Sequence, residues 1–365
     1  MANLQSLRWG IIATGQISSH FVQDLVLERP DAPIRHIVQA IGSSSIEKGQ
    51  AFASKFLPGF SPNIYGSYDE CYQDPEVDII YIGTPHAFHK QNCLDAIAAG
   101  KNVLCEKAFT VTAKEAIEVF EAARAKGVFV MEAMWTRHFP LVKRLQQLLH
   151  KEGLIGDIKR VFCDFGLKMD IASLGHESRL KNPSLGAGSL LDIGIYSLTW
   201  ALLGLESEAK DQSQGPTIVA KQTLQDAIDI ATAAILLYPD GRQGIITSSL
   251  EVESDDAFCR IEGSHGHILV EGLGTSVPSS FIVFTSKSPS DAGWMDSKKQ
   301  GLKAKRYDFE HPGMGFYWEA DAAAAHILAG ERESDRMPWS ETVRVMKILD
   351  EIRRQGGARF PQDEE

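Results

Sequence analysis

Two short segments place polar side chains where chemistry on a bound ligand could take place. They are residues 83–89, which read GTPHAFH, and residues 105–109, which read CEKAF, and each follows an apolar run typical of a buried strand. In an open α/β sheet, the carboxyl ends of the strands face the ligand crevice. We therefore expect Lys107 in that crevice. A lysine there can be a catalytic group, a phosphate ligand or a surface residue, and its position alone leaves all three open.

A third polar cluster lies in residues 182–196, which read NPSLGAGSLLDIGIY. If the chain is helical from Gly188 onward, Asp192 and Tyr196 lie four residues apart and share one face of the helix. The glycines of this segment would let a neighbouring element approach closely. Taken alone, the pattern favours a tightly packed helix in which Tyr196 is a core residue.

Residues 13–18, which read ATGQIS, predict a phosphate-binding turn. Small residues at its first, third and sixth positions let the backbone bend sharply, approach a pyrophosphate and offer it the N–H groups of a helix N-terminus. Ala13 and Ser18 stand where the usual pattern has glycine, but the place of the turn after a first strand supports a dinucleotide site. We expect cofactor contacts from Ala13, Thr14, Gly15, Gln16 and Ile17.

The end of the second predicted strand indicates which dinucleotide binds. A carboxylate at that point normally takes the ribose hydroxyls and repels a 2′-phosphate. Here the chain reads Ser43-Ser44-Ser45, with Lys48 one turn later, so three hydroxyls and one ammonium could hold the phosphate. The serines also suit the start of a helix, and the two roles are compatible. We therefore expect NADP rather than NAD.

Two histidine pairs raise the question of a metal site. His86 and His89 are followed by Cys93, and His265 and His267 form the second pair. Neither set has a fourth ligand at a plausible spacing, and a helix start after Pro85 explains the first pair. We expect no metal.

The elements that must position these residues fall into two patterns. Up to about residue 130, short apolar runs alternate with amphipathic segments, as in a doubly wound parallel sheet. Strands are expected over residues 7–12, 34–41, 77–83, 102–105 and 128–131. Helices are expected over residues 17–27, 45–56, 67–73, 89–99 and 113–126.

After Met134 the strand-like stretches become longer and alternate between apolar and polar residues. The sequence predicts strands over residues 158–166, 227–238, 244–250, 257–262, 267–270 and 281–285, and helices over residues 141–149, 314–328 and 340–354. Short turns between them argue for an antiparallel or mixed sheet. We predict a Rossmann domain over residues 1–134 and an α+β domain over residues 135–365, whose last helices pack back on the first.

Composition bounds the functions that remain. The chain has 365 residues, enough for two domains, and a formal net charge of −11. Such a surface repels phosphate backbones and anionic lipid heads, so we expect no nucleic-acid or membrane partner. Five widely spaced cysteines, the lack of a leader peptide and the lack of any run of about 18 apolar residues predict a cytoplasmic protein with reduced thiols.

Five ordered blocks of the sequence resemble the glucose–fructose oxidoreductase / inositol dehydrogenase family. These blocks are ATGQIS, TPHAFH, GKNVLCEKAFTVTA, MEAMWTRHFP and LLDIGIY, and together they span almost the whole chain. Four further features are similar to a branch of dehydrogenases that act on D-xylose or on trans-dihydrodiols. They are EKAFTVTA, MEAMWTR, the tyrosine that ends DIGIY and the late HPGMGFYWEAD.

The resemblance implies a Rossmann domain followed by a domain with a large, open, mostly antiparallel sheet, through which two copies form a homodimer. The family's Glu-Lys-Pro motif matches Glu106, Lys107 and Ala108, with alanine in the place of proline. Its Asp-x-Gly-x-His motif matches Asp192 to Tyr196, with tyrosine in the place of histidine. The first departure affects backbone stiffness, and the second changes the acid–base group.

In the mechanism that the resemblance implies, Tyr196 accepts the substrate's hydroxyl proton while a hydride leaves for the nicotinamide. A free tyrosine has a pKa near 10, so Lys107 and the cationic ring would have to lower it. Asp192 would orient the group by accepting a hydrogen bond. If Tyr196→Phe preserved the turnover that Lys107→Met abolished, Lys107 would carry the proton instead.

Further contacts follow from the same resemblance. The cofactor is expected to touch Thr84, Pro85, His86, His89, Glu106, Lys107, Trp135 and Arg137. The substrate wall is expected to comprise Trp135, Phe165, Arg179, Asn182 and Tyr196, with Arg137 beside it. Phe316 and Trp318 are expected to be core residues.

Three functions fit these expectations. The first is NADP-dependent oxidation of the C1 hydroxyl of an aldopyranose such as D-xylose to its lactone. The second is oxidation of a trans-1,2-dihydrodiol, and the third is a non-catalytic NADP-binding sensor. The presence of both Lys107 and Tyr196 favours an enzyme, because a sensor has no use for an ammonium beside the nicotinamide.

Overall fold

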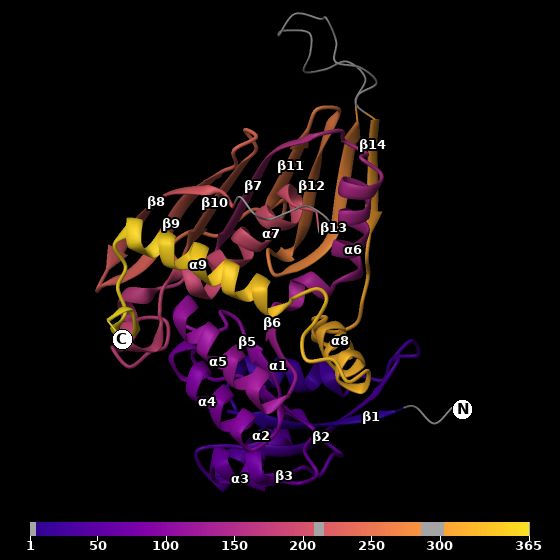
Figure 1. The fold of residues 1–365 in the computed structure, drawn as a ribbon, viewed down its shortest axis with the longest axis vertical. Coiled ribbons are helices and arrows are strands. Elements are labelled where there is room, and N and C mark those ends of the chain that lie inside the picture. Colours follow the sequence, from indigo (N-terminus) through magenta and orange to yellow (C-terminus); the bar gives the residue numbers. More distant parts are fainter. Residues whose placement is uncertain (1–4, 208–214, 286–302, 365) are drawn as a thin grey trace, which may run out of the picture.

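The computed structural model describes residues 5–207, 215–285 and 303–364, which form two layers built on two separate sheets (Figure 1). The first sheet has six parallel strands in the order β3-β2-β1-β4-β5-β6. These are β1 (Ser6–Ile12), β2 (Arg35–Gly42), β3 (Asn63–Tyr65), β4 (Ile79–Ile82), β5 (Asn102–Glu106) and β6 (Val130–Ala133). The predicted doubly wound parallel sheet is therefore confirmed, with β3 as a short strand that the sequence did not predict.

Five helices connect the strands of the first sheet. They are α1 (Gln16–Leu25), α2 (Ile46–Phe56), α3 (Tyr68–Gln73), α4 (His86–Ala98) and α5 (Ala113–Lys126). Polar side chains fix where three of them begin, because Ser45, Ser67 and Thr112 each accept a backbone N–H of the first turn. At the far end of α5, Gly127 adopts φ 77°, a left-handed conformation that ends the helix.

The second sheet has eight strands in the order β14-β13-β12-β11-β7-β10-β9-β8. These are β7 (Ile158–Gly166), β8 (Thr217–Gln225), β9 (Ile228–Leu237), β10 (Gln243–Ser249), β11 (Cys259–Gly263), β12 (Gly266–Gly274), β13 (Val277–Thr285) and β14 (Lys303–Asp308). Its neighbours pair antiparallel except β7 and β10, which are parallel. The predicted large, mostly antiparallel sheet is confirmed, and β8 and β14 are additions to it.

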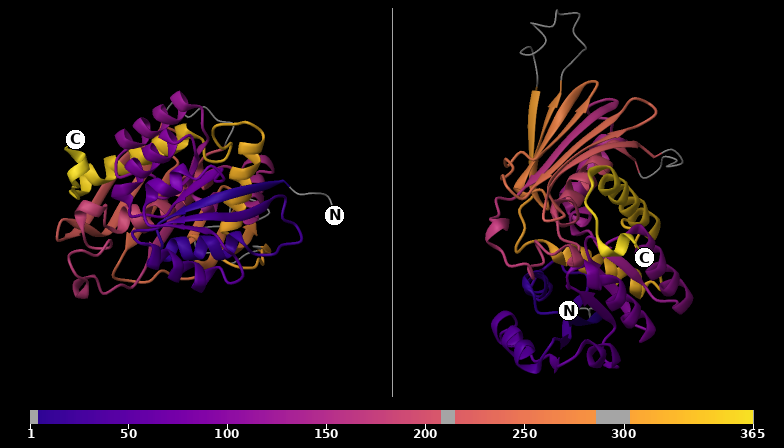
Figure 2. Two further views of the ribbon diagram at one scale, coloured as in Figure 1. Left: turned by 90° about the horizontal axis from the view of Figure 1, so that it is seen from below. Right: turned by 90° about the vertical axis from the view of Figure 1, so that its left-hand side faces the viewer.

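Helices cover one face of the second sheet (Figure 2). α7 (Ile195–Leu205) packs on the central strands β7 and β10, and α9 (Trp339–Gly356) packs on β8. Along β9 buried and exposed residues alternate, so that Ile235 and Leu237 lie on the uncovered face. The predicted helix over residues 141–149 is α6 (Pro140–Gln146) followed by a π-helical turn, Gln147–Lys151.

The last two long helices lie against the first layer. Asp24 in α1 accepts the backbone N–H groups of Met314, Gly315 and Phe316 and so caps α8 (Phe316–Leu328). Trp339 at the start of α9 stacks on Phe120 of α5, with ring centroids 5.3 Å apart. α9 consequently runs between the two layers (Figure 1).

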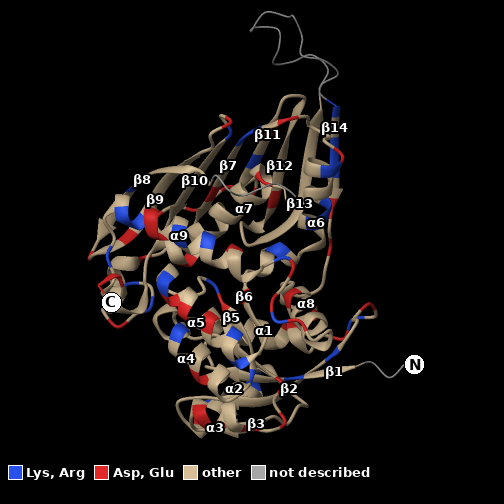
Figure 3. Cartoon of the chain, viewed as in Figure 1, with Lys and Arg blue, Asp and Glu red and all other residues tan. Residues whose placement is uncertain are grey.

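Charged residues are mixed rather than separated by sign. Figure 3 shows acidic and basic residues close to one another in the chain along α5 and α9. One stretch, 183–205, has the length and apolar composition of a membrane-crossing helix, but its apolar 18-residue window is entirely buried within the fold. It is the core helix under the second sheet.

Candidate active site

The phosphate-binding turn is built by the start of α1. Gly15 is the N-cap residue, no side chain of the described residues caps it, and the first turn of the helix contains no acidic residue. A Cβ atom placed on Gly15 would meet nothing within 4 Å, so the turn faces open space. Uncapped N–H groups at a helix N-terminus attract anions. The turn therefore fits the pyrophosphate of a dinucleotide.

The two residues that replace glycine in this turn each have a structural explanation. Ala13 adopts φ 73°, the left-handed conformation that glycine would take more readily. Ser18 lies against the end of β4, where a Cβ atom on Gly83 would come within 2.4 Å of the Ser18 Oγ. A small residue is therefore needed on both sides of this contact between helix and strand.

A cavity of about 510 Å³ opens on one side of the turn. It is lined by Thr14, Gly15, Ser43, Ser44 and Lys48, all predicted as cofactor residues. The Lys48 Nζ donates a 3.0 Å hydrogen bond to the Ser44 Oγ, which leaves the ammonium at the cavity wall. Positive charge and hydroxyl groups gathered at one point suit a phosphate.

The lining of this cavity differs from the prediction at Ser45 and Lys55. Ser45 does not line it, because its side chain caps α2 by accepting the Lys48 N–H. Lys55 lines it and was not predicted. The sequence held a signal for Lys55, since residues seven apart lie on the same face of a helix and Lys55 is seven residues after Lys48.

A second cavity, of about 170 Å³, opens on the other side of the same turn. It contains Lys107 together with polar groups from both layers. Its lining residues are Gln16, Ile17, His20, Gly83, Thr84, Pro85, His86, Glu106, Lys107, Arg179, Leu185 and Asp192. Thr14 and Gly15 of the turn line the first cavity, and Gln16 and Ile17 line the second. A ligand that lies across the turn could therefore reach into both cavities. His20 and Leu185 were not predicted.

Lys107 and Asp192 form the polar centre of this second cavity. The Lys107 Nζ donates a 2.7 Å hydrogen bond to the backbone oxygen of Asp192 and lies 3.7 Å from its Oδ1. Arg179 donates to the same Oδ1 at 3.2 Å. Burial disfavours the charged carboxylate, but the charges of Lys107 and Arg179 outweigh it and lower the pKa of Asp192 to about 2. Asp192 is therefore ionised at neutral pH.

The carboxyl of Glu106 contacts the backbone of Lys107. This carboxyl is buried and accepts hydrogen bonds from the Tyr81 hydroxyl at 2.7 Å and from the Lys107 N–H at 3.3 Å. Burial raises the pKa of Glu106. The peptide bond between Lys107 and Ala108 is cis.

The two predicted histidines have different positions. His86 lines the cavity, and its Nδ1 lies 3.0 Å from the Gly186 oxygen. Burial, together with the charges of His89 and Lys107, lowers the pKa of His86 to about 3, so the imidazole is neutral. His89 is buried between the backbone oxygens of Thr84 and Ala108 and joins the two strand-end segments.

Tyr196 lies beside this centre but behind the cavity wall. The Lys107 Nζ is 5.1 Å from the centre of its ring, and the Trp135 Nε1 donates a 2.6 Å hydrogen bond to its hydroxyl oxygen. Burial and the nearby Glu106 carboxyl raise the pKa of Tyr196 well above 10. We expected Lys107 to lower this pKa. The protein alone does not achieve that, because the burial of the phenol dominates.

Aromatic rings enclose Tyr196. Trp135 stacks on Phe316 with ring centroids 3.9 Å apart, and Phe165 contacts the Tyr196 ring edge-on at 5.7 Å. Trp318 packs against Phe139 at 4.7 Å. Phe316 is buried, as expected for a core residue, and Trp318 packs against the core while partly exposed.

Two predicted wall residues lie elsewhere. Arg137 points away from the Lys107 cavity, because its guanidinium pairs with Glu341 at 2.6 Å. Asn182 turns back on its own segment and accepts the Ser184 N–H, which caps a short 3-10 turn. Neither residue lines the cavity, and neither do Trp135, Phe165 and Tyr196. Of the residues predicted to bind substrate, Arg179 alone lines it.

The predicted helix from Gly188 begins as a π-helical turn, Leu190–Gly194, and continues as α7. The buried Asp229 fixes its start by accepting the Ser189 hydroxyl and the Leu190 N–H, both at 2.7 Å. Within the described ranges, no three His, Cys, Asp or Glu side chains cluster in a way that could hold a metal ion. The five cysteines are buried and unbridged.

Comparison with known families matches both layers. Residues 7–134 match a model described as "Oxidoreductase family, NAD-binding Rossmann fold". Residues 142–269 match the "GFO/IDH/MocA C-terminal domain". The two matches lie one after the other along the chain.

Relatives and solved structures agree with these models. The chain is 36% identical to a D-xylose 1-dehydrogenase (NADP(+)) of Hypocrea jecorina, over 99% of this chain and 94% of that protein. It is 32% identical to a trans-1,2-dihydrobenzene-1,2-diol dehydrogenase of Bos taurus, over 98% and 99% of the two chains. The fold matches a levoglucosan dehydrogenase in complex with NADH and levoglucosan, with a TM-score of 0.78 at 19% identity over 97% and 98% of the chains. It also matches a 3-ketoreductase of Actinomadura kijaniata, with a TM-score of 0.77 at 21% identity over 96% and 98%. This chain therefore belongs to the GFO/IDH/MocA family of oxidoreductases.

Proposed function

We propose that this protein is an NADP-dependent dehydrogenase that oxidises the C1 hydroxyl of an aldopyranose, with D-xylose as substrate and D-xylonolactone as product. The observation that carries the proposal is the Lys107 ammonium, held 2.7 Å from the Asp192 oxygen in a cavity that borders the phosphate-binding turn. The relative of Hypocrea jecorina supports the choice of substrate and cofactor.

The cofactor would lie across the turn. Its pyrophosphate would face the uncapped N–H groups at Gly15, and its 2′-phosphate would face Ser43, Ser44 and Lys48, with Lys55 near. The nicotinamide end would reach the second cavity, where a bound ring accepts the hydride. The local positive charge at Lys48 and Lys55 outweighs the distant, screened carboxylates of the −11 surface.

The reaction needs a base as well as a hydride acceptor. The C1–H bond breaks with its electron pair, the O–H proton leaves, and a C=O bond forms. Tyr196 takes this proton when a positive charge beside the phenol offsets the effect of its burial. The Trp135 N–H stabilises, through its 2.6 Å hydrogen bond, the phenolate that must be present before the proton is accepted, and the transfer converts this phenolate to the neutral phenol.

Lys107 and Arg179 hold the substrate in place. Both cations flank Asp192, and they present N–H donors to the hydroxyls of a sugar. Asp192 is ionised and orients the Lys107 ammonium. His86, being neutral, offers no positive charge to compete with them.

A trans-1,2-dihydrodiol is the second candidate substrate. Trp135 and Phe165 contact Tyr196, and Phe316 stacks on Trp135. These aromatic rings would suit an aromatic substrate, and the relative of Bos taurus supports this alternative. A non-catalytic NADP sensor is a third alternative, which the retention of Lys107 and Tyr196 disfavours.

We also propose that two copies associate through the uncovered face of the second sheet and that the protein acts in the cytoplasm. Val219, Ile235 and Leu237 are exposed on β8 and β9, and apolar residues at such a face favour burial by a partner. Sedimentation analysis of the wild type beside Ile235→Glu tests the dimer. An unchanged mass for the variant would contradict this interface.

One absorbance assay tests the enzymatic proposal. NADPH formation is followed with D-xylose, with other aldoses and with a trans-dihydrodiol, and the first is repeated with NAD. We expect the largest kcat/KM with D-xylose and NADP. A larger value with the diol favours the second candidate, a larger value with NAD removes the 2′-phosphate assignment, and tight NADP binding without turnover of any substrate indicates a sensor.

A further inference from the structure

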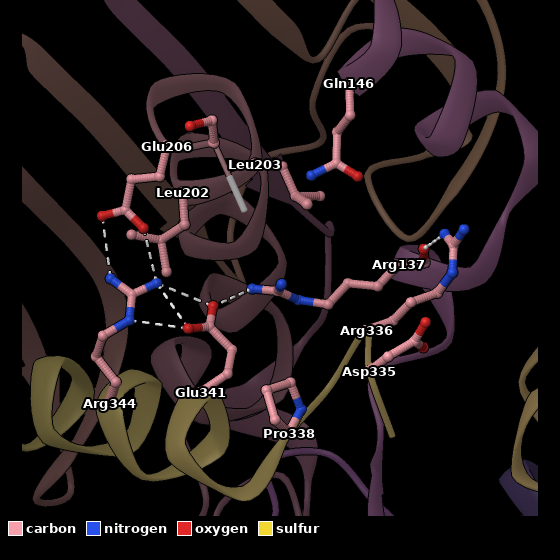
Figure 4. A pocket seen from close by; sticks show the side chains of 11 residues that line it. Arg137, Gln146, Leu202, Leu203, Glu206, Asp335, Arg336, Pro338, Glu341 and Arg344 are labelled. Atoms are coloured by element: carbon pink, nitrogen blue, oxygen red, sulfur yellow. Dashed lines mark hydrogen bonds and ion pairs between the residues drawn. The ribbon is translucent and has the colours of Figure 1, made fainter. Parts of the chain in front are cut away.

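A third cavity, of about 140 Å³, lies where α6, α7 and α9 meet (Figure 4). It is separate from the Lys107 cavity and shares none of its lining residues. The polar side chains that line it are Arg137, Gln146, Glu206, Ser207, Asp335, Arg336, Glu341 and Arg344. Arg137 and Gln146 lie between β6 and the end of α6, Glu206 follows α7, and Arg344 lies in α9, so three distant parts of the chain build the wall.

Two carboxylates of this cavity, those of Glu206 and Glu341, are already fully used. Glu341 accepts from Arg137 at 2.6 Å and from Arg344 at 2.8 and 2.9 Å. Glu206 accepts from the Tyr238 hydroxyl at 2.6 Å and from Arg344 at 3.0 Å. Figure 4 shows this chain of ion pairs along one wall. Few acceptor positions are left to bind a cation or a donor-rich ligand.

Several donors of the same cavity, in contrast, are unused. The Nε of Arg137 is buried without a partner, although this side chain is more than nine-tenths buried. The Gln146 amide has no hydrogen-bond partner in the described part of the chain. Arg336 donates 3.3 Å to the Arg137 backbone oxygen, and no carboxylate of the described residues pairs with its guanidinium. A buried unpaired donor is costly unless a ligand or water accepts from it.

The charges of the lining residues balance formally, with three arginines against the carboxylates of Glu206, Asp335 and Glu341, but they are unevenly paired. Asp335, next to Arg336, pairs with His326, and its side chain is 78% exposed. Glu206 and Glu341 pair with Arg137 and Arg344, and among the described residues no carboxylate lies at ion-pair distance from the guanidinium of Arg336. His138, the neighbour of Arg137, is neutral, because burial and then the charges of Arg336 and Arg137 lower its pKa to about 3. The positive charges of Arg336 and Arg137 therefore act on His138, a buried residue.

We propose that this cavity binds a small oxyanion, carried either by a phosphate or by a carboxylate group. An oxyanion supplies acceptors only, which is what unused N–H donors and a guanidinium outside ion-pair distance of the described carboxylates require. A cavity of about 140 Å³ has room for several water molecules and hence for a ligand of a few heavy atoms. The site lies outside the residues to which we assign cofactor and substrate.

Calorimetric titration of the NADP-saturated full chain tests the proposal. Saturation fills the phosphate sites at the Gly15 turn, so that added anions report on other sites. Inorganic phosphate and succinate are titrated separately, which distinguishes a phosphate from a carboxylate ligand, and glycerol serves as the neutral probe. We expect saturable binding of at least one anion per chain and none of glycerol.

Two variants locate the binding site. Arg336→Gln removes the guanidinium, and we expect it to weaken anion binding by about tenfold or more. Gln146→Leu removes a donor on the opposite wall without touching the ion pairs, and we expect about threefold weaker binding. Arg332→Gln is the matched control, because this exposed arginine belongs to the same loop but does not line the cavity.

Three results would overturn the assignment. They are no saturable binding of either anion up to about 20 mM, equal binding by the wild type and both cavity variants, or equal losses in Arg332→Gln and Arg336→Gln. Should Arg336→Gln fail to fold, Gln146→Leu alone decides, because a partly exposed amide without partners can be replaced at little cost to stability.

Discussion

The indole N–H of Trp135 donates a 2.6 Å hydrogen bond to the hydroxyl oxygen of Tyr196. Trp135 directly follows the first sheet, whereas Tyr196 begins the helix that packs on the second sheet. The orientation of the phenol is therefore set by a residue of the other layer. The hydrogen bond also favours the phenolate, because a donor stabilises the charged form of the group that it contacts.

Trp135→Phe should slow turnover without unfolding the protein. Phenylalanine keeps a ring to stack on Phe316 but lacks the N–H. The apparent pKa of Tyr196 therefore rises, and we expect kcat at neutral pH to fall about tenfold. The measurement is kcat against pH, whose alkaline rise should move to higher pH. Trp318→Phe is the control, because this ring packs nearby on Phe139. Equal effects of both substitutions would assign Trp135 a packing role only.

Substitutions of Lys107 and of Tyr196 should change kcat and KM in different ways. Tyr196→Phe removes the proton acceptor, and we expect kcat to fall by about 10² or more, with little change in KM. Lys107→Met removes both the substrate donor and the partner of Asp192, so kcat should fall and KM should rise. Steady-state kinetics with D-xylose measures both. Should Tyr196→Phe keep most of its turnover while Lys107→Met keeps none, the proton acceptor is Lys107.

The features that could be predicted from the sequence are local ones. The phosphate-binding turn, Lys48 and the position of Lys107 after β5 depend on residues close together in the chain, and the structure places them beside cavities that suit these roles. β14 could not be predicted, because this edge strand has an exposed side chain at five of its six residues and therefore no apolar period. β3 spans three residues, too few for a pattern.

The long-range pairings were outside the reach of the sequence. Arg137 is a residue type that often binds ligands, but its guanidinium pairs with Glu341, 204 residues later in the chain. The local sequence gives no sign of this pairing. Asp192 is held partly through its backbone oxygen, to which no side-chain motif points. The surroundings of Tyr196 likewise come from distant parts of the chain, such as Phe165. Its burial raises the pKa of Tyr196, whereas the local motif suggested the opposite.

Cofactor preference should depend on Lys48 and, to a smaller degree, on Lys55. Lys48→Gln removes an exposed ammonium at the cavity wall, and we expect the Kd for NADP to rise about tenfold while the Kd for NAD stays the same. Lys143→Gln is the control, since this exposed lysine on α6 changes the net charge equally without lining the cavity. Fluorescence titration of the free protein measures both constants. If the Kd for NAD rose by the same factor, Lys48 would contact a part of the cofactor other than the 2′-phosphate.

Asp192 should make stability depend on pH in the acid range. Its pKa is lowered from 3.8 to about 2, so its favourable contribution is fully present above about pH 4 and is lost as the pH falls through about 2. The shift corresponds to about 2 kcal/mol in the free energy of unfolding. This value needs no reduction for solvent screening, because the Asp192 side chain is only 13% exposed. Asp192→Asn should therefore lower the stability at pH 7 by about that amount and flatten its pH dependence between about pH 4 and pH 2.

Thermal unfolding of both proteins across that pH range measures the difference. Asp170→Asn is a suitable control, since this carboxyl caps a short surface turn and carries no ion pair in the described part of the chain. If wild type and Asp192→Asn lose stability in parallel as the pH falls, the ionised carboxylate does not contribute to folding. Lys107 and Arg179 would then be held by other contacts, and the assignment of Asp192 as the residue that positions Lys107 would be lost with it.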